Sequence, residues 1–167
     1  MVDAGRPDLP ACVAPDGTGY AGPVRLAQCT VIGTLRSRVL ELVSNSLLLA
    51  SAPAGVPPVD AERRQEGCVR YSHVPAGSRT PRRHRCVPAS AGDEARMSPQ
   101  FISLRYADPG YLQHTASTAR ELREGADDAS EMGVFHDLFQ PQRHSNLRVR
   151  LDEYLRVGLE AGILHAT

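Results

Sequence analysis

Carboxylates and a histidine gather in the segment GADDASEMGVFHD, residues 125–137. Asp127, Asp128, Glu131 and His136 are of the types that bind metals and transfer protons in metallohydrolases. On a helix, however, Glu131 and His136 would point about 140° apart and would not converge. Asp128 and Glu131 also suit a helix N-terminus, where carboxylates accept free N–H groups. We expect a structural role for this cluster, and the alternative is a catalytic or metal-binding role that includes Asp137.

A second group of possible metal ligands consists of two cysteines and two histidines, Cys68, His73, His84 and Cys86. Structural zinc sites place two pairs of ligands two to four residues apart, and the pattern C-x4-H-x10-H-x-C does not match that spacing. A disulfide between Cys68 and Cys86 would contribute about 3 kcal/mol in an oxidising compartment. Two reduced, buried and inert thiols are the expectation, with no metal and no cofactor.

Arginine dominates residues 62–86, ERRQEGCVRYSHVPAGSRTPRRHRC. A nucleic-acid site would need aromatic stacking partners, and only Tyr71 lies nearby. The chain also has 19 basic and 19 acidic residues, whereas dedicated nucleic-acid binders are usually basic. We expect intramolecular ion pairs or plain solvation, with a protein partner as the alternative to both. The expected pairing or interaction residues are Arg79, Arg82, Arg83, Arg85, Asp127, Asp128 and Glu131. Reversing Arg82 and Arg83 to Glu should then destabilise the fold.

No catalytic signature stands out in the 167 residues. The nucleophile elbow G-x-S-x-G, the zinc motif H-E-x-x-H, the P-loop and the dinucleotide fingerprint are absent from the sequence. Catalytic triads are assembled in space, so an enzyme is not excluded, but the sequence favours a non-catalytic protein. It has no apolar run of signal-peptide or membrane-spanning length, which predicts a cytoplasmic protein without a membrane partner.

The elements that would position these residues divide the chain into four parts. Residues 1–23 are rich in Gly, Pro and Asp and predict a flexible leader. Residues 24–76 alternate apolar and polar side chains, which is typical of strands, with Asn45 in a left-handed bend. The runs QCTVIG, SNSLLLA and EGCVRYS resemble one another, and this favours three coils of a β-solenoid over an antiparallel meander.

The remaining two parts are a loop and a cap. Residues 77–100 predict an Arg-, Pro- and Gly-rich loop, and residues 101–167 predict a strand followed by helices. Thr118 with Glu121, and Asp128 with Glu131, have the spacing of capping boxes. The last helix should begin near Ser145, and its i, i+4 stripe should pack back to close the end of the stack. That stripe consists of Leu147, Leu151, Leu155 and Leu159.

Four long runs carry a family resemblance: RRQEGCVRYSHVPAGSRTPRRHRC, SLRYADPGY, GADDASEMGVFHDLFQPQR and NLRVRLDEYLRVGLEAGI. Together they resemble the C-terminal part of large, uncharacterised bacterial proteins associated with gene clusters for phage-tail-like contractile injection systems. The resemblance covers most of the chain from about Val24 onward. It implies the last coils of a right-handed parallel β-helix and a terminal segment, in a truncated gene product or a chain that a longer partner completes. It supplies no catalytic residues.

Two functions follow as expectations. The first is a structural or protein-interaction module, the terminal fragment of a β-helix protein that docks on a longer β-helix protein or another subunit of a large assembly. The second is a module that binds or degrades polysaccharides, by analogy with other parallel β-helices. Exposed aromatic rows and a carboxylate cluster on one face would favour the second. Residues 24–60 contain no aromatic residue and only Glu41 and Asp60 as acids, so the sequence favours the first.

Overall fold

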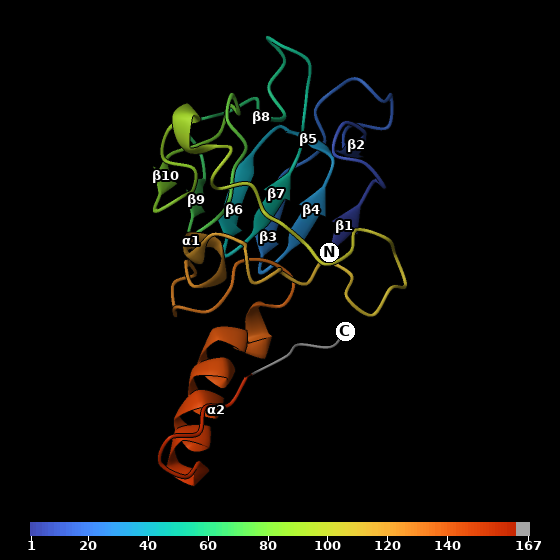
Figure 1. Cartoon of the computed structure of the whole chain (residues 1–167). Helices are drawn as coiled ribbons and strands as arrows, with labels where there is room; N and C mark the ends of the chain where they lie inside the picture. The colour runs from blue at the N-terminus through green and yellow to red at the C-terminus, as the bar shows by residue number, and fades with distance from the viewer. Residues whose placement is uncertain (163–167) are drawn as a thin grey trace.

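A computed structural model describes residues 1–162 and is β-rich, with parallel sheets in its front part and a short C-terminal helix (Figure 1). The front of the chain therefore confirms the predicted β structure. Its strands are β1 (Val2–Asp3), β2 (Pro10–Cys12), β3 (Val24–Ala27), β4 (Thr30–Ile32), β5 (Thr34–Ser37), β6 (Leu40–Ser44), β7 (Leu47–Leu49), β8 (Val59–Ala61), β9 (Cys68–Arg70) and β10 (Arg83–His84). The helices are η1 (Ala91–Asp93), α1 (Arg120–Arg123), η2 (His136–Leu138) and α2 (Gln140–Tyr154).

The strands form three sheets, and every strand pair is parallel. Sheet A has the order β1-β4-β7, sheet B the order β2-β5-β8, and sheet C the order β10-β9-β6-β3. From β1 to β9 the chain visits A, B and C in the same sequence each time. Isolated bridges continue the pattern, because His73 pairs with Leu47 and with Val87, and Arg79 pairs with Asp60.

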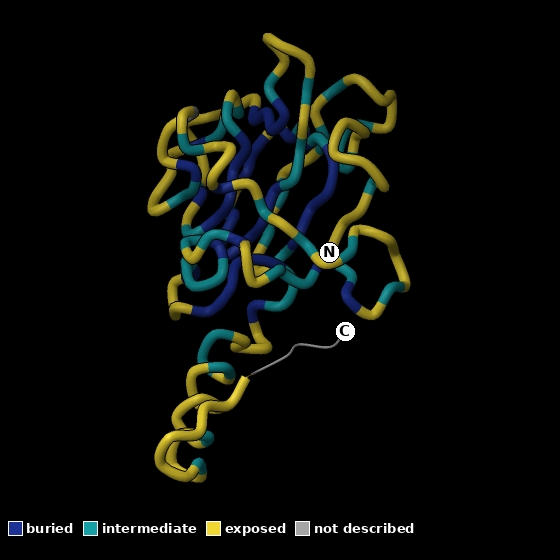
Figure 2. The backbone as a smooth tube through the Cα atoms, viewed as in Figure 1, coloured by how far each residue is buried: buried dark blue, intermediate teal, exposed yellow. Residues whose placement is uncertain are grey.

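Apolar side chains from all three sheets meet in one core. Figure 2 shows the buried residues along the strands in dark blue. Val31 and Leu48 come from sheet A, Leu35 from sheet B, and Val43 and Val69 from sheet C. Short strands can build this core because each one stacks its inward residues on those of the strand beside it. The core depends on the register between strands more than on the length of any one strand.

A left-handed residue follows each strand of sheet C. Gln28, Asn45, Tyr71 and Arg85 have φ values of 53°, 50°, 47° and 49°. Asparagine tolerates this conformation better than most residues, and the predicted left-handed bend at Asn45 is confirmed. The four residues form a corner between sheets C and A, and we call this feature the left-handed corner.

Small polar side chains stack directly after this corner. The hydroxyl of Ser46 accepts the N–H of Cys29 at 3.2 Å, and the hydroxyl of Ser72 accepts the N–H of Ser46 at 3.1 Å. The predicted likeness of QCTVIG to SNSLLLA is therefore matched in space. The third run, EGCVRYS, matches at a different position. Ser72, and not Cys68, continues the stack of small polar side chains that includes Ser46.

The first 23 residues are not an irregular leader as predicted. β1 pairs with β4, and β2 pairs with β5, so both strands extend the sheets. Strands of two or three residues between Gly- and Pro-rich turns are too short to show a periodic pattern. The predicted loop 77–100 is likewise interrupted by β10, which pairs with β9.

The irregular segment that contains Tyr111, Leu122 and Met132 covers the outer face of sheet A. Leu47 turns outward and packs with Leu122 and Met132, whereas its neighbour Leu48 turns into the main core. At the β1 edge, the hydroxyl of Tyr111 donates to the carboxylate of Asp3. A sheet buried on both faces explains the continuous apolar run of β7. The predicted helical cap is thus mostly non-helical, with α1 only four residues long.

Neither predicted capping box forms. The N-cap of α1 is Ala119, and the hydroxyl of Thr118 donates to the backbone oxygen of Gln100 at 2.7 Å. No helix begins at Asp128, since residues 126–135 form turns and bends. The capping pattern is short, and Thr118 bonds instead to Gln100, while Asp128 accepts bonds from Ser130 within its own loop.

The helix α2 begins at Gln140, before the predicted Ser145, and it extends away from the sheets (Figure 1). No residue of α2 is buried. The prediction that this helix packs back on the sheets is therefore wrong. None of the helices within residues 1–162 has the length and apolar character needed to cross a membrane.

Candidate functional site

The predicted arginines lie apart from the acidic residues they were expected to pair with. Arg83 donates to Thr80 Oγ1 at 2.8 Å and to the backbone oxygen of Ser78 at 2.9 Å. The guanidinium carbon of Arg85 lies 5.8 Å from the ring centre of Tyr71. Arg79 is the parallel-bridge partner of Asp60 in sheet B.

Within residues 1–162, no ion pair joins Arg79, Arg82, Arg83 or Arg85 to Asp127, Asp128 or Glu131. The predicted pairing is therefore wrong. Charge content along the sequence indicates which groups could pair, but the position of β10 on sheet C decides which ones meet.

The acidic groups of α1 have other partners. Glu121 accepts Arg96 at 2.7 Å, and Glu124 accepts Arg120 at 2.6 Å. Both pairs are solvent-exposed, so each contributes little to stability. Arg85 shares a shallow cavity of about 620 Å³ with Glu121 and Glu124, where Val87 and Met132 supply apolar surface.

The acidic loop, residues 126–137, is anchored at the left-handed corner. Asn45 Nδ2 donates to Asp127 Oδ1 at 2.7 Å, and the N–H of Asp127 donates to Asn45 Oδ1 at 3.2 Å. Further along the loop, the N–H of Gly133 donates to the backbone oxygen of Asn45 at 2.8 Å. The N–H of Val134 donates to Thr30 Oγ1 at 3.1 Å. These four bonds fix the loop against the ends of sheet C and the start of sheet A.

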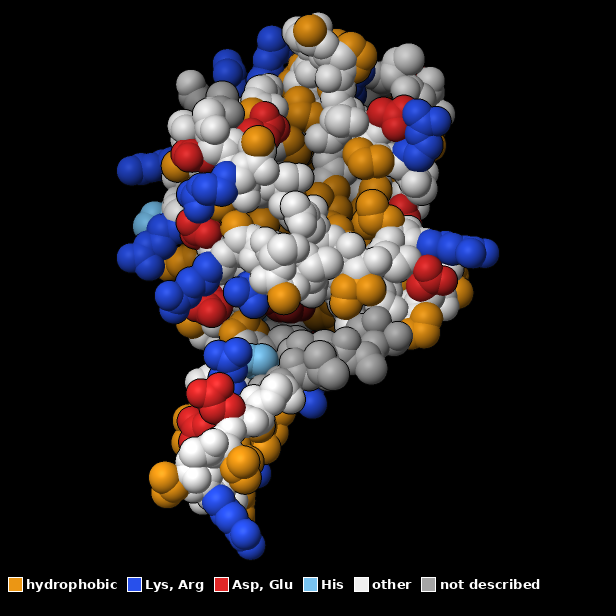
Figure 3. Space-filling view, in the orientation of Figure 1, with side chains coloured by type: hydrophobic (Ala, Val, Ile, Leu, Met, Phe, Trp, Pro, Cys, Tyr) orange, Lys and Arg blue, Asp and Glu red, His pale blue; other side chains and the backbone are white. Residues whose placement is uncertain are grey.

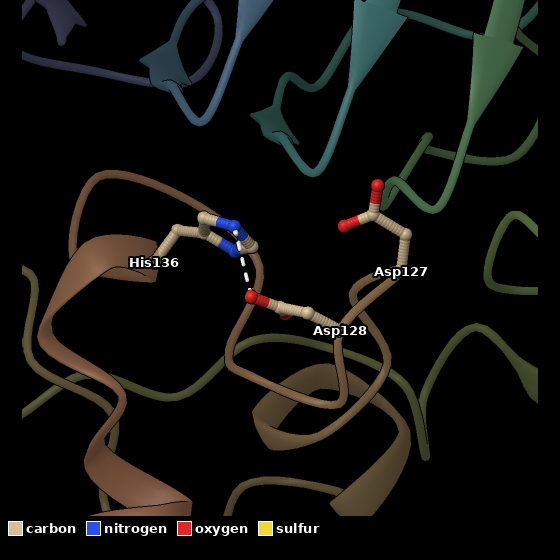
Figure 4. A group of neighbouring side chains, drawn as sticks. All are labelled: Asp127, Asp128 and His136. Atoms are coloured by element: carbon tan, nitrogen blue, oxygen red, sulfur yellow. Dashed lines mark ion pairs between the residues drawn. The ribbon is translucent and has the colours of Figure 1, made fainter.

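Ser130, His136 and Asp128 meet inside this loop, although they are not joined by a helix. Figure 4 shows the ring of His136 facing the carboxylate of Asp128, with Asp127 directed elsewhere. Nε2 of His136 lies 3.5 Å from Asp128 Oδ2, and Nδ1 lies 2.7 Å from Ser130 Oγ. Divergence was expected for Glu131 and His136, and the approach of Asp128 to His136 was not predicted. That expectation assumed a helix, and the loop instead turns back on itself.

The arrangement does not activate a nucleophile. Ser130 is fully buried, and its hydroxyl donates to Asp128 Oδ1 at 2.5 Å. His136 Nδ1 also lies 3.1 Å from the backbone oxygen of Glu131, which can only accept, so Nδ1 carries a proton. In a catalytic triad the histidine must instead accept the serine proton. The buried side chains of Ser130 and His136 and the exposed carboxylate of Asp128 form a network that holds the loop closed.

Asp127, Asp128 and His136 also offer one ligand atom each within 4.8 Å of one another. Carboxylate and imidazole are suitable ligands for zinc and related divalent ions. Here Asn45 already bonds to the carboxylate of Asp127, while Ser130 and His136 contact the carboxylate of Asp128. A cation would have to replace these bonds, so the present geometry is that of a structural latch.

Glu131 is the one strongly perturbed carboxyl in the loop. It is 5% exposed, and burial raises the pKa of its side chain to about 7. It caps no helix and forms no ion pair in the described part of the chain, contrary to both roles predicted for it. Burial of this side chain has no local signal in the sequence, because it follows from how the loop folds.

The four residues of the alternative zinc constellation have separate environments. His73 is buried with Nδ1 3.1 Å from the backbone oxygen of Leu48, and burial lowers its pKa. His84 is exposed and lies edge-on to Tyr71. Cys86 Sγ donates to the backbone oxygen of Val69 at 3.4 Å. Within residues 1–162, Asp127, Asp128 and His136 are the only such set of three ligand groups.

Comparisons of the chain with protein-family models, curated proteins and solved structures found no match.

Proposed function

We propose that the chain is a non-catalytic structural or protein-interaction module, the terminal part of a parallel β-helix protein in a large assembly. Successive passages through sheets A, B and C would be coils of that β-helix. Its partner would be a longer β-helix protein or a neighbouring subunit that continues the stack. The resemblance to proteins associated with phage-tail-like contractile injection systems suggests an assembly of that class.

The observation that carries the proposal is the open edge formed by β1, β2 and β3. Each of these strands is the last one in its sheet, and in Figure 1 β1 and β2 lie at the opposite end of the strand row from β10. The N–H of Val24 and the N–H of Gln28 bond to the β6 side. Backbone groups alternate along a strand, so those of Arg25 and Ala27 point to the open edge. Such an edge is a template for strands of a partner.

Apolar side chains border this edge. Met1, Val2 and Leu9 are exposed at the ends of β1 and before β2. Tyr106 is 75% exposed and packs edge-on against Tyr111, which bonds to Asp3 in β1. A docked coil would cover these side chains and pair the free backbone groups in one step.

The test replaces Ala27 by Pro, which removes an N–H on the open edge and no bond to β6. Ala27→Val is the matched control, because it keeps the N–H and suits a strand. We measure the mass of each chain by light scattering over a range of concentrations, and its stability by thermal melting. The wild type and Ala27→Val should form higher oligomers through the edge, since backbone pairing is not specific to one sequence. Ala27→Pro should weaken this association by about tenfold while melting like the wild type.

Equal association of Ala27→Pro and Ala27→Val, or a wild type that stays unassociated at every concentration, would overturn the proposal. No observation in the described residues favours the polysaccharide alternative. The strongly exposed aromatic residues, Tyr106 and Tyr154, belong to two separate segments and form no row for stacking sugar rings.

A further inference from the structure

The helix α2 lacks the contacts that usually stabilise a helix of its length. It has 15 residues, no buried residue and no side-chain cap at its N-terminus. Isolated helices of about 12–15 residues are marginal in water, and packing of an apolar face normally supplies their stability. Near its start, Gln142 donates to the backbone oxygen of Asp128 at 3.3 Å. Beyond this point the helix extends from the main body, with hydrophobic side chains visible along it in Figure 3.

An apolar stripe follows one side of the helix. Leu147 and Leu151 are one turn apart, and Leu155 follows at the C-cap. Leu147 is 44% exposed, and Tyr154, beside the stripe, is 87% exposed. Leu151 and Leu155 are half-buried, so the stripe is partly exposed. An apolar stripe at this spacing is typical of a helix that meets another helix.

Charge is distributed unevenly along α2. All its arginines, Arg143, Arg148 and Arg150, precede its acidic residues, Asp152 and Glu153, which lie at its end. The first turn has no acidic residue and the last turn has no basic one. This order opposes the helix dipole, which favours anions at the N-terminus and cations at the C-terminus. A helix running in the opposite direction alongside would place its acidic end beside the arginines.

We propose that α2 is a self-association helix that pairs antiparallel with the α2 of a second copy. Leu147, Leu151 and Leu155 of each copy form the contact. On one flank, Arg148 of each copy lies beside Asp152 of the other. A parallel pair would bring the two sets of arginines together, so the charges select the antiparallel direction. The two-fold symmetry makes the contact a closed dimer, separate from the open strand edge.

The first test removes the stripe in the Ala27→Pro background, so that edge association does not contribute. Leu151→Ser replaces a stripe residue, and Val149→Ser is the control. Two residues turn a helix by about 200°, so Val149 points away from the stripe. Light scattering should show a dimer for the parent and for Val149→Ser, and at least about tenfold weaker association for Leu151→Ser. The main thermal transition should not move, because α2 buries no residue in the body.

The second test distinguishes a second copy from any other occupant of the stripe. Arg148→Glu makes the contact flank wholly acidic, and Asp152→Arg makes it wholly basic. Each variant alone should dimerise at least about tenfold less well than the parent, whereas an equimolar mixture should restore the dimer as a heterodimer. Native mass spectrometry separates the two masses.

Three outcomes would overturn the proposal. A monomeric parent chain would mean that another partner covers the stripe. Equal effects of Leu151→Ser and Val149→Ser would show that the stripe is not the contact. A mixture of the charge variants that associates no better than either alone would exclude the antiparallel pair.

Discussion

Asn45 and Asp127 hold each other by two hydrogen bonds across 82 residues of sequence, through Nδ2 to Oδ1 at 2.7 Å and through N–H to Oδ1 at 3.2 Å. One residue belongs to the left-handed corner of the sheets, and the other begins the turn of the acidic loop. The pair therefore connects the parallel sheets to the segment that covers them. Asn45 suits both tasks, because it tolerates positive φ and carries a donor and an acceptor.

Asn45→Gly should lower the free energy of unfolding by about 2 kcal/mol, because it keeps the left-handed backbone but removes both side-chain bonds. Urea denaturation measures the change. Gln28→Gly is the matched control, since Gln28 has the same backbone conformation and is exposed. Equal stability of the two variants would mean that the contact with Asp127 contributes nothing.

Gly67→Ala should prevent normal packing, whereas Gly77→Ala should be tolerated. A Cβ at Gly67 would lie 1.8 Å from the backbone oxygen of Leu40, but a Cβ at Gly77 has nothing within 4 Å. Both residues have positive φ, 91° and 74°, so the left-handed strain of about 1 kcal/mol is common to both. The difference between their melting temperatures isolates the steric clash in β6. Similar melting temperatures would show that β9 does not approach β6 this closely.

Glu131→Gln should stabilise the protein above neutral pH. Burial raises the pKa of Glu131 to about 7 from its ordinary value of 4.5, so the folded state keeps a proton that the unfolded state loses. Stability is therefore lost as the pH rises from 4.5 through 7, by an amount on the order of 2 kcal/mol. Urea denaturation at pH 5 and pH 8 should show a larger loss for the wild type than for Glu131→Gln. A Glu41→Gln chain, altered at an exposed site, should follow the wild type.

Arg82→Glu should change the free energy of unfolding by less than about 0.5 kcal/mol, because Arg82 is exposed and forms no ion pair within residues 1–162. Arg83→Glu should cost about 1 kcal/mol through its bonds to Thr80 and Ser78. Thermal melting of the two single variants separates these effects. A large loss of stability in Arg82→Glu would support the hypothesis that this arginine pairs with an acidic residue.

The candidate site was only partly predictable. The sequence indicated that Asp127, Asp128, Glu131 and His136 belong together as a chemical group. It assigned them to a helix, because short polar segments with capping patterns resemble helix starts. Ser130 was missed, since a buried serine between charged residues has no periodic signal. The network that joins Ser130 to His136 exists only because the loop turns back on itself, and the bonds to Asn45 and Thr30 stabilise that turn.

Local sequence was sufficient to predict β structure in residues 24–76 and a left-handed bend at Asn45, because side-chain alternation and backbone tolerance are properties of single residues and near neighbours. It was also sufficient to predict a helix with a leucine stripe near the C-terminus. Tertiary structure alone decided that β1 and β2 extend the sheets, that Asp127 meets Asn45, and that α2 turns its stripe away from the body. Each of these depends on pairing between distant segments, whose free energy comes from register and burial in the assembled sheets and has no counterpart in any short stretch of sequence.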